Sequence, residues 1–265
     1  MTQPTSRTAK NVLANFFGWG WTAAMGLICF PIYVHFLGIE AFGLVGFFTI
    51  LQSTLVPFDL GLSIALSREL AALSTEEDTG SHMRDLVRTL ELIYWALAVA
   101  VGLGVWLLAP LIARYWVRAD RVPLTDVEQA VALMGPALTL VWPFNLYARG
   151  VMGLQHHVRL NALNFVMVTL RYLGVVPVLW LIGATVQTFF IWQIGAYALH
   201  TLATALLLWY TLPAAPRRAH FRVARVREVW RFAAGLSGVS ITAVILAQLD
   251  KIILSKALPL ELLGY

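Results

Sequence analysis

Residues 91–114 read ELIYWALAVAVGLGVWLLAPLIAR, and no charged side chain interrupts this stretch between Glu91 and Arg114. A hydrocarbon core roughly 30 Å thick needs about 20 helical residues at ~1.5 Å rise each. This stretch meets that length, and six others resemble it. The seven predicted membrane helices span residues 11–37, 41–67, 91–114, 129–152, 161–183, 186–210 and 232–258.

The composition also favours a membrane protein. Apolar residues make up 59% of the 265 residues and charged residues only 12%, about half the charged share of soluble domains. The mean hydropathy is +0.74. We therefore expect an all-α integral membrane protein. Cys29 is the single cysteine, so the chain can form neither an intrachain disulfide nor a thiolate metal site.

The distribution of positive charge predicts the orientation. With a cytoplasmic N-terminus, thirteen of the nineteen Lys and Arg residues flank or occupy cytoplasmic segments, and four lie on the outer side. Cytoplasmic loops of membrane proteins are enriched in Lys and Arg, so the net charge of +5 reflects orientation and does not indicate nucleic acid. We expect residues 69–90, 153–160 and 213–231 to be cytoplasmic and residues 115–128 to be extracytoplasmic.

A short internal repeat predicts how the chain is divided. LGIEAFGL at 37–44 follows the first apolar run, and LPLELLGY at 258–265 follows the seventh, with leucine, glutamate and glycine in register. The seventh run therefore resembles the start of a second copy of the first six. We expect a six-helix bundle at 1–212, a basic linker at 213–231 and the first helix of a second bundle at 232–265. The chain would then correspond to the first half, plus one helix, of a longer two-bundle architecture.

The basic linker carries apolar residues at helical spacing. Val223, Val226 and Trp230 recur opposite Arg218 and Arg222, which is typical of an amphipathic helix at the inner headgroup layer. A plain solvated linker is the alternative.

Charged residues within the apolar runs are the candidate functional residues. A charge at mid-bilayer costs about 2.5–3.5 kcal/mol on insertion scales, so such side chains usually face a protein interior or a wet cavity. The candidates for a substrate cavity are Asp59, Arg149, Arg171, Asp250 and Lys251, with Gln52, Asn145, Asn164 and Gln248 as a secondary polar lining.

Most of these candidates also have a purely structural interpretation, whereas Arg171 and Lys251 lie well inside their spans and are harder to explain in this way. Arg149 can extend to the headgroups, and Asp59 can pair with an arginine of a neighbouring helix. Asp250 can form a local salt bridge with Lys251. The amide side chains can form interhelical hydrogen bonds.

The chain shows no pattern typical of an enzyme. Gly18-Trp19-Gly20 and Gly102-Leu103-Gly104 lie inside apolar helices and are not nucleotide loops, and no Gly-x-Ser-x-Gly elbow occurs. His156 and His157 are adjacent, whereas a zinc-binding helix carries its histidines four residues apart. We expect a transporter with no catalytic residues, no cofactor and no metal.

Four stretches carry a family resemblance. They are Pro31 with Phe36-Leu37-Gly38 and Phe42-Gly43; Phe58-Asp59-Leu60-Gly61-Leu62 with Arg68 and Glu69; Gly150-x-x-Gly153-Leu154-Gln155 with Asn161; and Gln248-Leu249-Asp250-Lys251 with Leu258 and Gly264-Tyr265. Through them nearly the whole chain is similar to the Wzx-type polysaccharide and O-antigen flippases of the multidrug/oligosaccharidyl-lipid/polysaccharide exporter superfamily.

The resemblance implies two six-helix bundles around a cavity that opens alternately to either side of the bacterial inner membrane. The implied substrate is an oligosaccharide on undecaprenyl pyrophosphate, with polysaccharide polymerase and assembly proteins as further partners beside the membrane lipids. A cationic lumen would give Arg171 and Lys251 a role in attracting the pyrophosphate. Relatives carry most of a second bundle, whereas this chain is expected to carry only the first helix of one. In this respect the chain departs from the family pattern.

Two other functions stay open on the sequence. One is a cation-coupled drug antiporter of the same superfamily, in which Asp59 would carry the proton. The other is a membrane subunit of a polysaccharide assembly complex that does not itself transport.

Overall fold

We describe the computed structural model over residues 4–117, 119–227 and 229–230, with side chains from Phe16 onward except at positions 56 and 57. The principal elements are α1 (Pro4–Leu37), α2 (Ile39–Leu55), the 3₁₀ turn η1 (Val56–Asp59), α3 (Leu62–Leu73), α4 (Gly80–Tyr115), α5 (Leu124–Gly153), α6 (His157–Leu181) and α7 (Val186–Thr211). The predicted run at 232–258, with Gln248, Asp250 and Lys251, lies outside the described residues, as does the predicted start of a second bundle at 232–265.

The length and composition of the helices confirm an all-α integral membrane protein. In the described part of the chain, five helices are long and apolar enough to cross a membrane, namely α1 from Phe16 onward, α4, α5, α6 and α7. The helix α2 is also apolar but shorter, at 17 residues. The limits of α5 and α7 lie within five residues of the predicted ones.

The second predicted membrane helix, 41–67, is broken in the structure. The helix α2 ends at Leu55, a 3₁₀ turn follows, and α3 begins only at Leu62. Proline at position 57 has no N–H to donate to the helix, and Leu60 and Gly61 adopt left-handed φ angles of 50° and 69°. The sequence predicted one continuous helix here, and the structure shows a full interruption.

The cytoplasmic loop predicted at 69–90 is much shorter than expected. Helix α3 continues to Leu73 and α4 begins at Gly80, so residues 74–79 alone connect them. At 36 residues, α4 is about 54 Å long and exceeds the hydrocarbon thickness, so its first turns carry polar side chains beyond the apolar run. The sequence estimate was wrong here because it counted only the apolar part of the helix.

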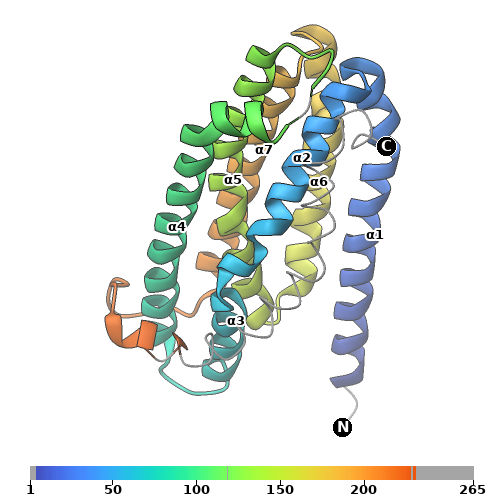
Figure 1. Cartoon of the computed structure of the whole chain (residues 1–265). Helices are drawn as coiled ribbons and strands as arrows, with labels where there is room; N and C mark the ends of the chain where they lie inside the picture. The colour runs from blue at the N-terminus through green and yellow to red at the C-terminus, as the bar shows by residue number, and fades with distance from the viewer. Residues whose placement is uncertain (1–3, 118, 228, 231–265) are drawn as a thin grey trace.

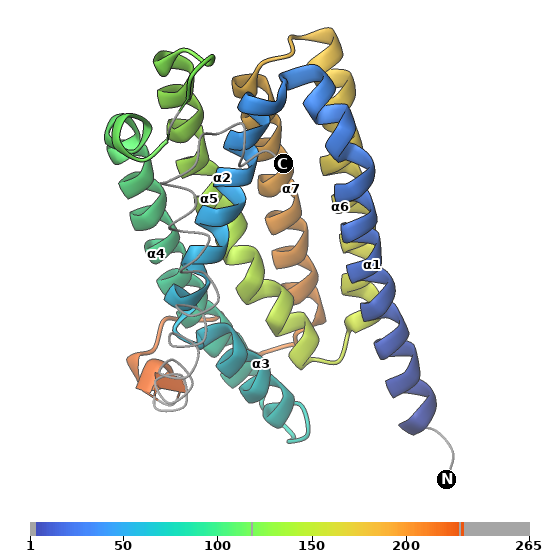
Figure 2. The same cartoon turned by 45° about the vertical axis from the view of Figure 1, so that its right-hand side comes forward.

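The helices form one bundle with their axes roughly aligned (Figure 1). The N-terminus of α1 marks the lower end of the bundle in this view. Helix α1 packs mainly on α6, whereas α5 packs on α3, α4 and α7. Figure 2 shows α1 and α6 side by side at the right and α4 at the left, with α7 between them.

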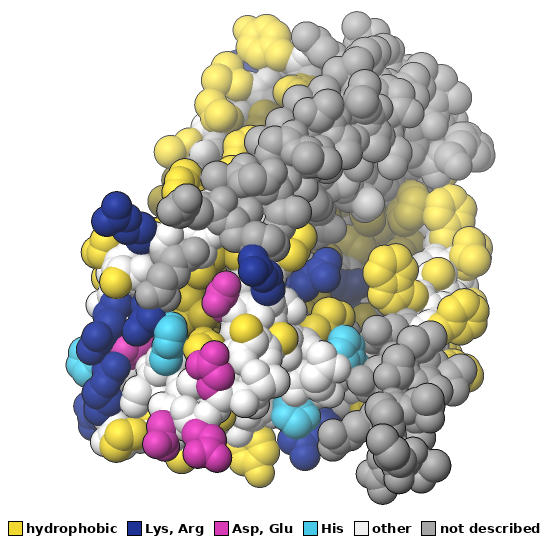
Figure 3. All heavy atoms as spheres, turned by 90° about the horizontal axis from the view of Figure 1, so that it is seen from below, with side chains coloured by type: hydrophobic (Ala, Val, Ile, Leu, Met, Phe, Trp, Pro, Cys, Tyr) yellow, Lys and Arg dark blue, Asp and Glu magenta, His cyan; other side chains and the backbone are white. Residues whose placement is uncertain are grey.

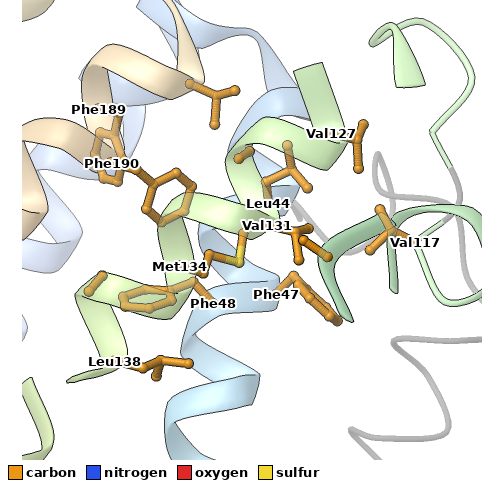
Figure 4. Packing of buried hydrophobic residues seen from close by; sticks show 14 of the residues in the cluster. Leu44, Phe47, Phe48, Val117, Val127, Val131, Met134, Leu138, Phe189 and Phe190 are labelled. Carbon is orange, nitrogen blue, oxygen red and sulfur yellow. The ribbon is translucent and has the colours of Figure 1, made fainter. Parts of the chain in front are cut away.

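Two apolar cores hold the bundle together. In the upper core, Phe47 and Phe48 of α2, Met134 of α5 and Phe190 of α7 interdigitate (Figure 4). The lower core joins α3, α4, α5 and the end of α7, and α6 contributes Leu160 to it. The upper core therefore joins α1, α2, α4, α5, α6 and α7, whereas the lower core lies mainly between α3, α4 and α5.

Candidate functional site

A cavity of about 530 Å³ lies between the helices, lined by residues of α2, η1, α3, α5, α6 and α7. Seen from below, the described surface is hollowed, and arginine side chains lie beside the hollow (Figure 3). The cavity brings together five of the residues that the sequence singled out: Gln52, Asp59, Asn145, Arg149 and Arg171.

The interruption between α2 and α3 places Asp59 in the cavity wall. Its carboxylate accepts hydrogen bonds from the Ser63 hydroxyl at 2.8 Å and from the Ser63 backbone N–H at 3.3 Å. Ser63 lies in the first turn of α3, so Asp59 also holds the start of that helix. Within the described residues Asp59 forms no ion pair with an arginine, although Arg149 lines the same cavity.

Asn145 and Arg149 are one turn apart on α5, and both side chains are exposed to the cavity. Arg149 lies near the lower end of α5, which ends at Gly153. The sequence left open whether Arg149 extends to the headgroups or faces the interior. The structure places it in the cavity wall, and the described residues offer it no ion-pair partner.

Arg171 lies on α6 between two aromatic rings. The Cζ atom of its guanidinium is 4.9 Å from the ring centroid of Tyr172 and 5.0 Å from that of Tyr197. Such contacts stabilise a cation by about 0.5–2 kcal/mol, more when it is shielded from water. Among the described residues no carboxylate forms an ion pair with Arg171. Among the described residues the cavity wall therefore carries two arginines and one aspartate, and neither arginine forms an ion pair with a carboxylate.

The amide and histidine side chains form hydrogen bonds between helices. Gln52 of α2 donates to the Tyr197 hydroxyl of α7 at 3.2 Å. Asn164 of α6 is hydrogen-bonded to His200 of α7, with 2.9 Å between Oδ1 and Nε2. Gln52 and His200 line the cavity, whereas Asn164 lies behind His200 and does not. For Asn164 the structure favours the interhelical interpretation.

The sequence model of the family described as "Polysaccharide biosynthesis protein" matches residues 8–265, which is nearly the whole chain. The chain belongs to the polysaccharide biosynthesis protein family. Members of this family are membrane transporters rather than enzymes. No curated protein and no solved structure matches the chain.

The aromatic lining of the cavity in this polysaccharide biosynthesis protein was missed from the sequence. Trp142, Phe144 and Tyr197 line it, but each occurs in an apolar run where an aromatic residue is ordinary. A signal did exist for Tyr197, because Gln193, Tyr197, His200 and Thr204 recur at helical spacing along one stripe of α7. His200 lies on the same stripe and also lines the cavity, but it was not among the candidates from the sequence.

A second polar cluster was also missed, at the lower end of α4. The Asp85 side chain is fully buried there and accepts bonds from Arg217 (Nη1 at 3.1 Å, Nη2 at 2.5 Å) and from the backbone N–H of His220 at 3.0 Å. Arg222 adds an ion pair at 3.0 Å. Part of the predicted linker is therefore docked on α4, and Figure 1 shows this orange segment beside the lower end of that helix.

The helical part of this linker begins later than the sequence predicted. Residues 223–227 are helical, while 213–222 are not. The side chains of Val223 and Trp230 are exposed, as an apolar face toward the headgroups requires, whereas Arg222 turns back to α4.

The described residues contain no group of three or more metal-ligating side chains. The cavity lining supplies cations, amides, hydroxyls and aromatic rings. These are groups that bind a polar, anionic molecule by hydrogen bonds and stacking.

Proposed function

We propose that the protein moves a lipid-linked oligosaccharide of the undecaprenyl-pyrophosphate type across the bacterial inner membrane by alternating access. The proposal rests on Arg171. In this polysaccharide biosynthesis protein, Arg171 lies deep in the bundle and lines the cavity, and no carboxylate among the described residues forms an ion pair with it. An uncompensated cation in a membrane is costly, and an anionic ligand would offset that cost.

The two arginines suit a pyrophosphate by geometry as well as by charge. A guanidinium presents N–H donors in a planar fork that matches pairs of phosphate oxygens. Arg149 lies near the lower end of the cavity, and Arg171 lies fourteen residues along α6 from His157, about 20 Å from the helix start. A headgroup could therefore interact first with Arg149 and then with Arg171.

We also propose that the N-terminus is cytoplasmic and that the chain is divided into a first bundle, a linker and the start of a second bundle. With a cytoplasmic N-terminus, the lower end of the bundle faces the cytoplasm. Residues 232–265 would begin a second bundle and supply a further wall of the cavity, with Gln248, Asp250 and Lys251 on it. Membrane lipids and the polysaccharide assembly proteins are the proposed partners.

A cation-coupled antiporter is the second candidate, because Asp59 is an acidic group in the cavity wall. The hydrogen bonds from Ser63 occupy both of its carboxylate oxygens. Two arginines against one aspartate favour an anionic substrate, so we rank the flippase first.

Substitution of Arg171 in the native gene tests the proposal. Charge-assisted hydrogen bonds contribute about 1.5–3 kcal/mol, and each 1.4 kcal/mol is tenfold in binding. We expect Arg171→Ala to lower surface polysaccharide about tenfold or more, with lipid-linked oligosaccharide accumulating in the cell, while Arg171→Lys retains part of the export. Immunodetection of surface polysaccharide measures the effect.

Arg114→Ala is the matched control, because Arg114 pairs with Glu128 at the upper end of the bundle and lies outside the cavity. It should export normally. Normal export by Arg171→Ala combined with Asp59→Ala would show that the charges are structural, and the substrate role of Arg171 would then be wrong.

A further inference from the structure

The backbone around Arg171 is held by two other helices. The indole N–H of Trp192, on α7, donates to the Arg171 carbonyl at 3.1 Å. The Tyr33 hydroxyl, on α1, donates to the Tyr172 carbonyl at 2.7 Å. Both carbonyls thus gain a second hydrogen bond from outside α6. Gly174 leaves the space that the Trp192 ring fills, since a Cβ there would collide with the ring.

The guanidinium of Arg171 lies over two aromatic rings. Tyr172 and Tyr197 both place their rings within about 5 Å of its Cζ. A cation–π contact uses the face of the aromatic ring and, unlike an ion pair, does not require the five N–H donors of the guanidinium. Tyr172 also hydrogen-bonds the guanidinium, whereas Tyr197 contacts it through the ring. The two residues therefore restrict the orientation of the side chain, and the remaining N–H donors can bind a ligand.

The ring of Tyr197 is in turn positioned from the opposite wall of the cavity. Gln52 of α2 donates to its hydroxyl, and Phe48 of the same helix packs near the ring, with 6.2 Å between the centroids. Tyr172 follows Arg171 directly in the chain, but Tyr197 comes from α7. The orientation of Arg171 consequently depends on how α6 and α7 pack together.

We propose that Tyr197 is a positioning residue, whose ring holds the Arg171 guanidinium so that its in-plane donors receive a pair of anionic oxygens in the cavity. This inference rests on the proposed function and deepens it. The ligand chemistry is an oxyanion with two adjacent oxygens. It can be supplied either by a phosphate of the carrier lipid or by the carboxylate of an acidic sugar in the oligosaccharide.

Anion binding to the purified chain in lipid nanodiscs tests this inference. Inorganic pyrophosphate and glucuronate are titrated separately by calorimetry, to represent the two sources. Tyr197→Phe keeps the ring and should retain most of the affinity, whereas Tyr197→Leu should bind the anion about tenfold more weakly. Tyr210→Leu is the control, because Tyr210 lies on the same helix and is 82% exposed.

A double-mutant cycle separates positioning from stability. If Tyr197 acts through the arginine, Tyr197→Leu should add no further loss of affinity to Arg171→Ala. Additive losses, or equal losses from Tyr197→Phe and Tyr197→Leu, would overturn the inference, and so would an intact chain that binds neither anion.

The same titrations distinguish the two levels of the proposal. Binding of glucuronate but not pyrophosphate, with the pattern of variants above, would support the role of Tyr197 and contradict the assignment of Arg171 to the carrier headgroup. Normal polysaccharide export by Arg171→Ala, together with the expected binding pattern, would sustain the anion site and contradict the proposed function.

Discussion

At the scale of single residues, two glycines set the closest approach of α4 and α5. A Cβ built on Gly135 would lie 2.5 Å from the carbonyl oxygen of Gly102, and one built on Gly102 would lie 2.7 Å from that of Gly135. Apolar side chains gain little by leaving lipid for a helix interface, so close packing contributes much of the association between membrane helices. Gly102 and Gly135 permit that packing at the centre of the pair.

Replacement of Gly135 by alanine should therefore destabilise the bundle. The neighbouring atoms are the carbonyl oxygen of Gly102 and the backbone N and Cβ of Trp106, which cannot move without separating the helices. We expect a loss of about 1–3 kcal/mol, typical of overpacked cores. Thermal unfolding of the detergent-purified protein measures it.

Gly104→Ala provides the control, because a Cβ at Gly104 meets no atom within 4 Å. That variant should be neutral or slightly more stable, as alanine favours the helix. Equal stability of the two variants would mean that the close approach of α4 and α5 does not limit stability.

At the scale of the elements, the segment after α7 is anchored to the lower end of α4. Besides the bonds to Asp85, the Arg84 side chain donates to the carbonyls of Pro213 at 2.8 Å and Leu212 at 3.3 Å. The backbone N–H of Arg222 donates to the Thr89 hydroxyl at 3.0 Å. A segment that composition alone describes as a basic linker is thus held in a defined place where α7 leaves the bundle.

Removal of both arginine partners of Asp85 should release this segment. Arg217→Ala with Arg222→Ala leaves a fully buried carboxylate without a countercharge, and breaking a buried pair typically costs about 3–5 kcal/mol. Here the cost should be smaller, because the arginine side chains are 38% and 49% exposed. We expect faster amide hydrogen exchange across residues 212–222.

The control removes the same charge from elsewhere on the linker. Arg218 and Arg227 are exposed, and the structure records no ion pair for either within the described residues. The variant Arg218→Ala with Arg227→Ala should exchange as the unaltered protein does. If both double variants exchange equally fast, net charge and not the bonds to Asp85 holds the segment.

At the scale of the whole molecule, the two ends of the bundle carry different connections between the helices and therefore differ chemically. The lower end has the connection at residues 74–79 and the segment after α7, and the upper end has the connection after α4. The upper connection is itself ordered by a buried acid, since Glu40 accepts the backbone N–H groups of Asp120 and Arg121 at 2.5 and 2.9 Å.

Labelling of single cysteines on intact spheroplasts with a membrane-impermeant thiol reagent checks the orientation. In a Cys29→Ser background, Glu77→Cys reports the lower end and Thr125→Cys the upper end, and both positions are exposed. The excess of Lys and Arg at the lower end predicts labelling of position 125 alone. Labelling of position 77 without position 125 would place the lower end outside the cell.

The class of the protein was determined by the sequence alone. Long apolar runs such as 91–114 force a helix, because lipid offers no partner for an unpaired backbone group. The same physics marks Asp59 and Arg171 as candidates, since an ionisable residue in such a run needs a partner or a cavity. Five candidate residues do line one cavity, and helical spacing along each run was enough to group those on a single helix.

Only the tertiary structure decided which side chains meet across helices. Asp85 resembles any solvated residue in the sequence, yet it binds Arg217, which lies 132 positions later. The rings around Arg171 look like ordinary apolar positions, and Tyr197 reaches the arginine only because α6 and α7 pack together. A sequence pattern reports the environment of each helix separately. The contacts between helices depend on how close their backbones come and how they are rotated, and that is a property of the packed bundle.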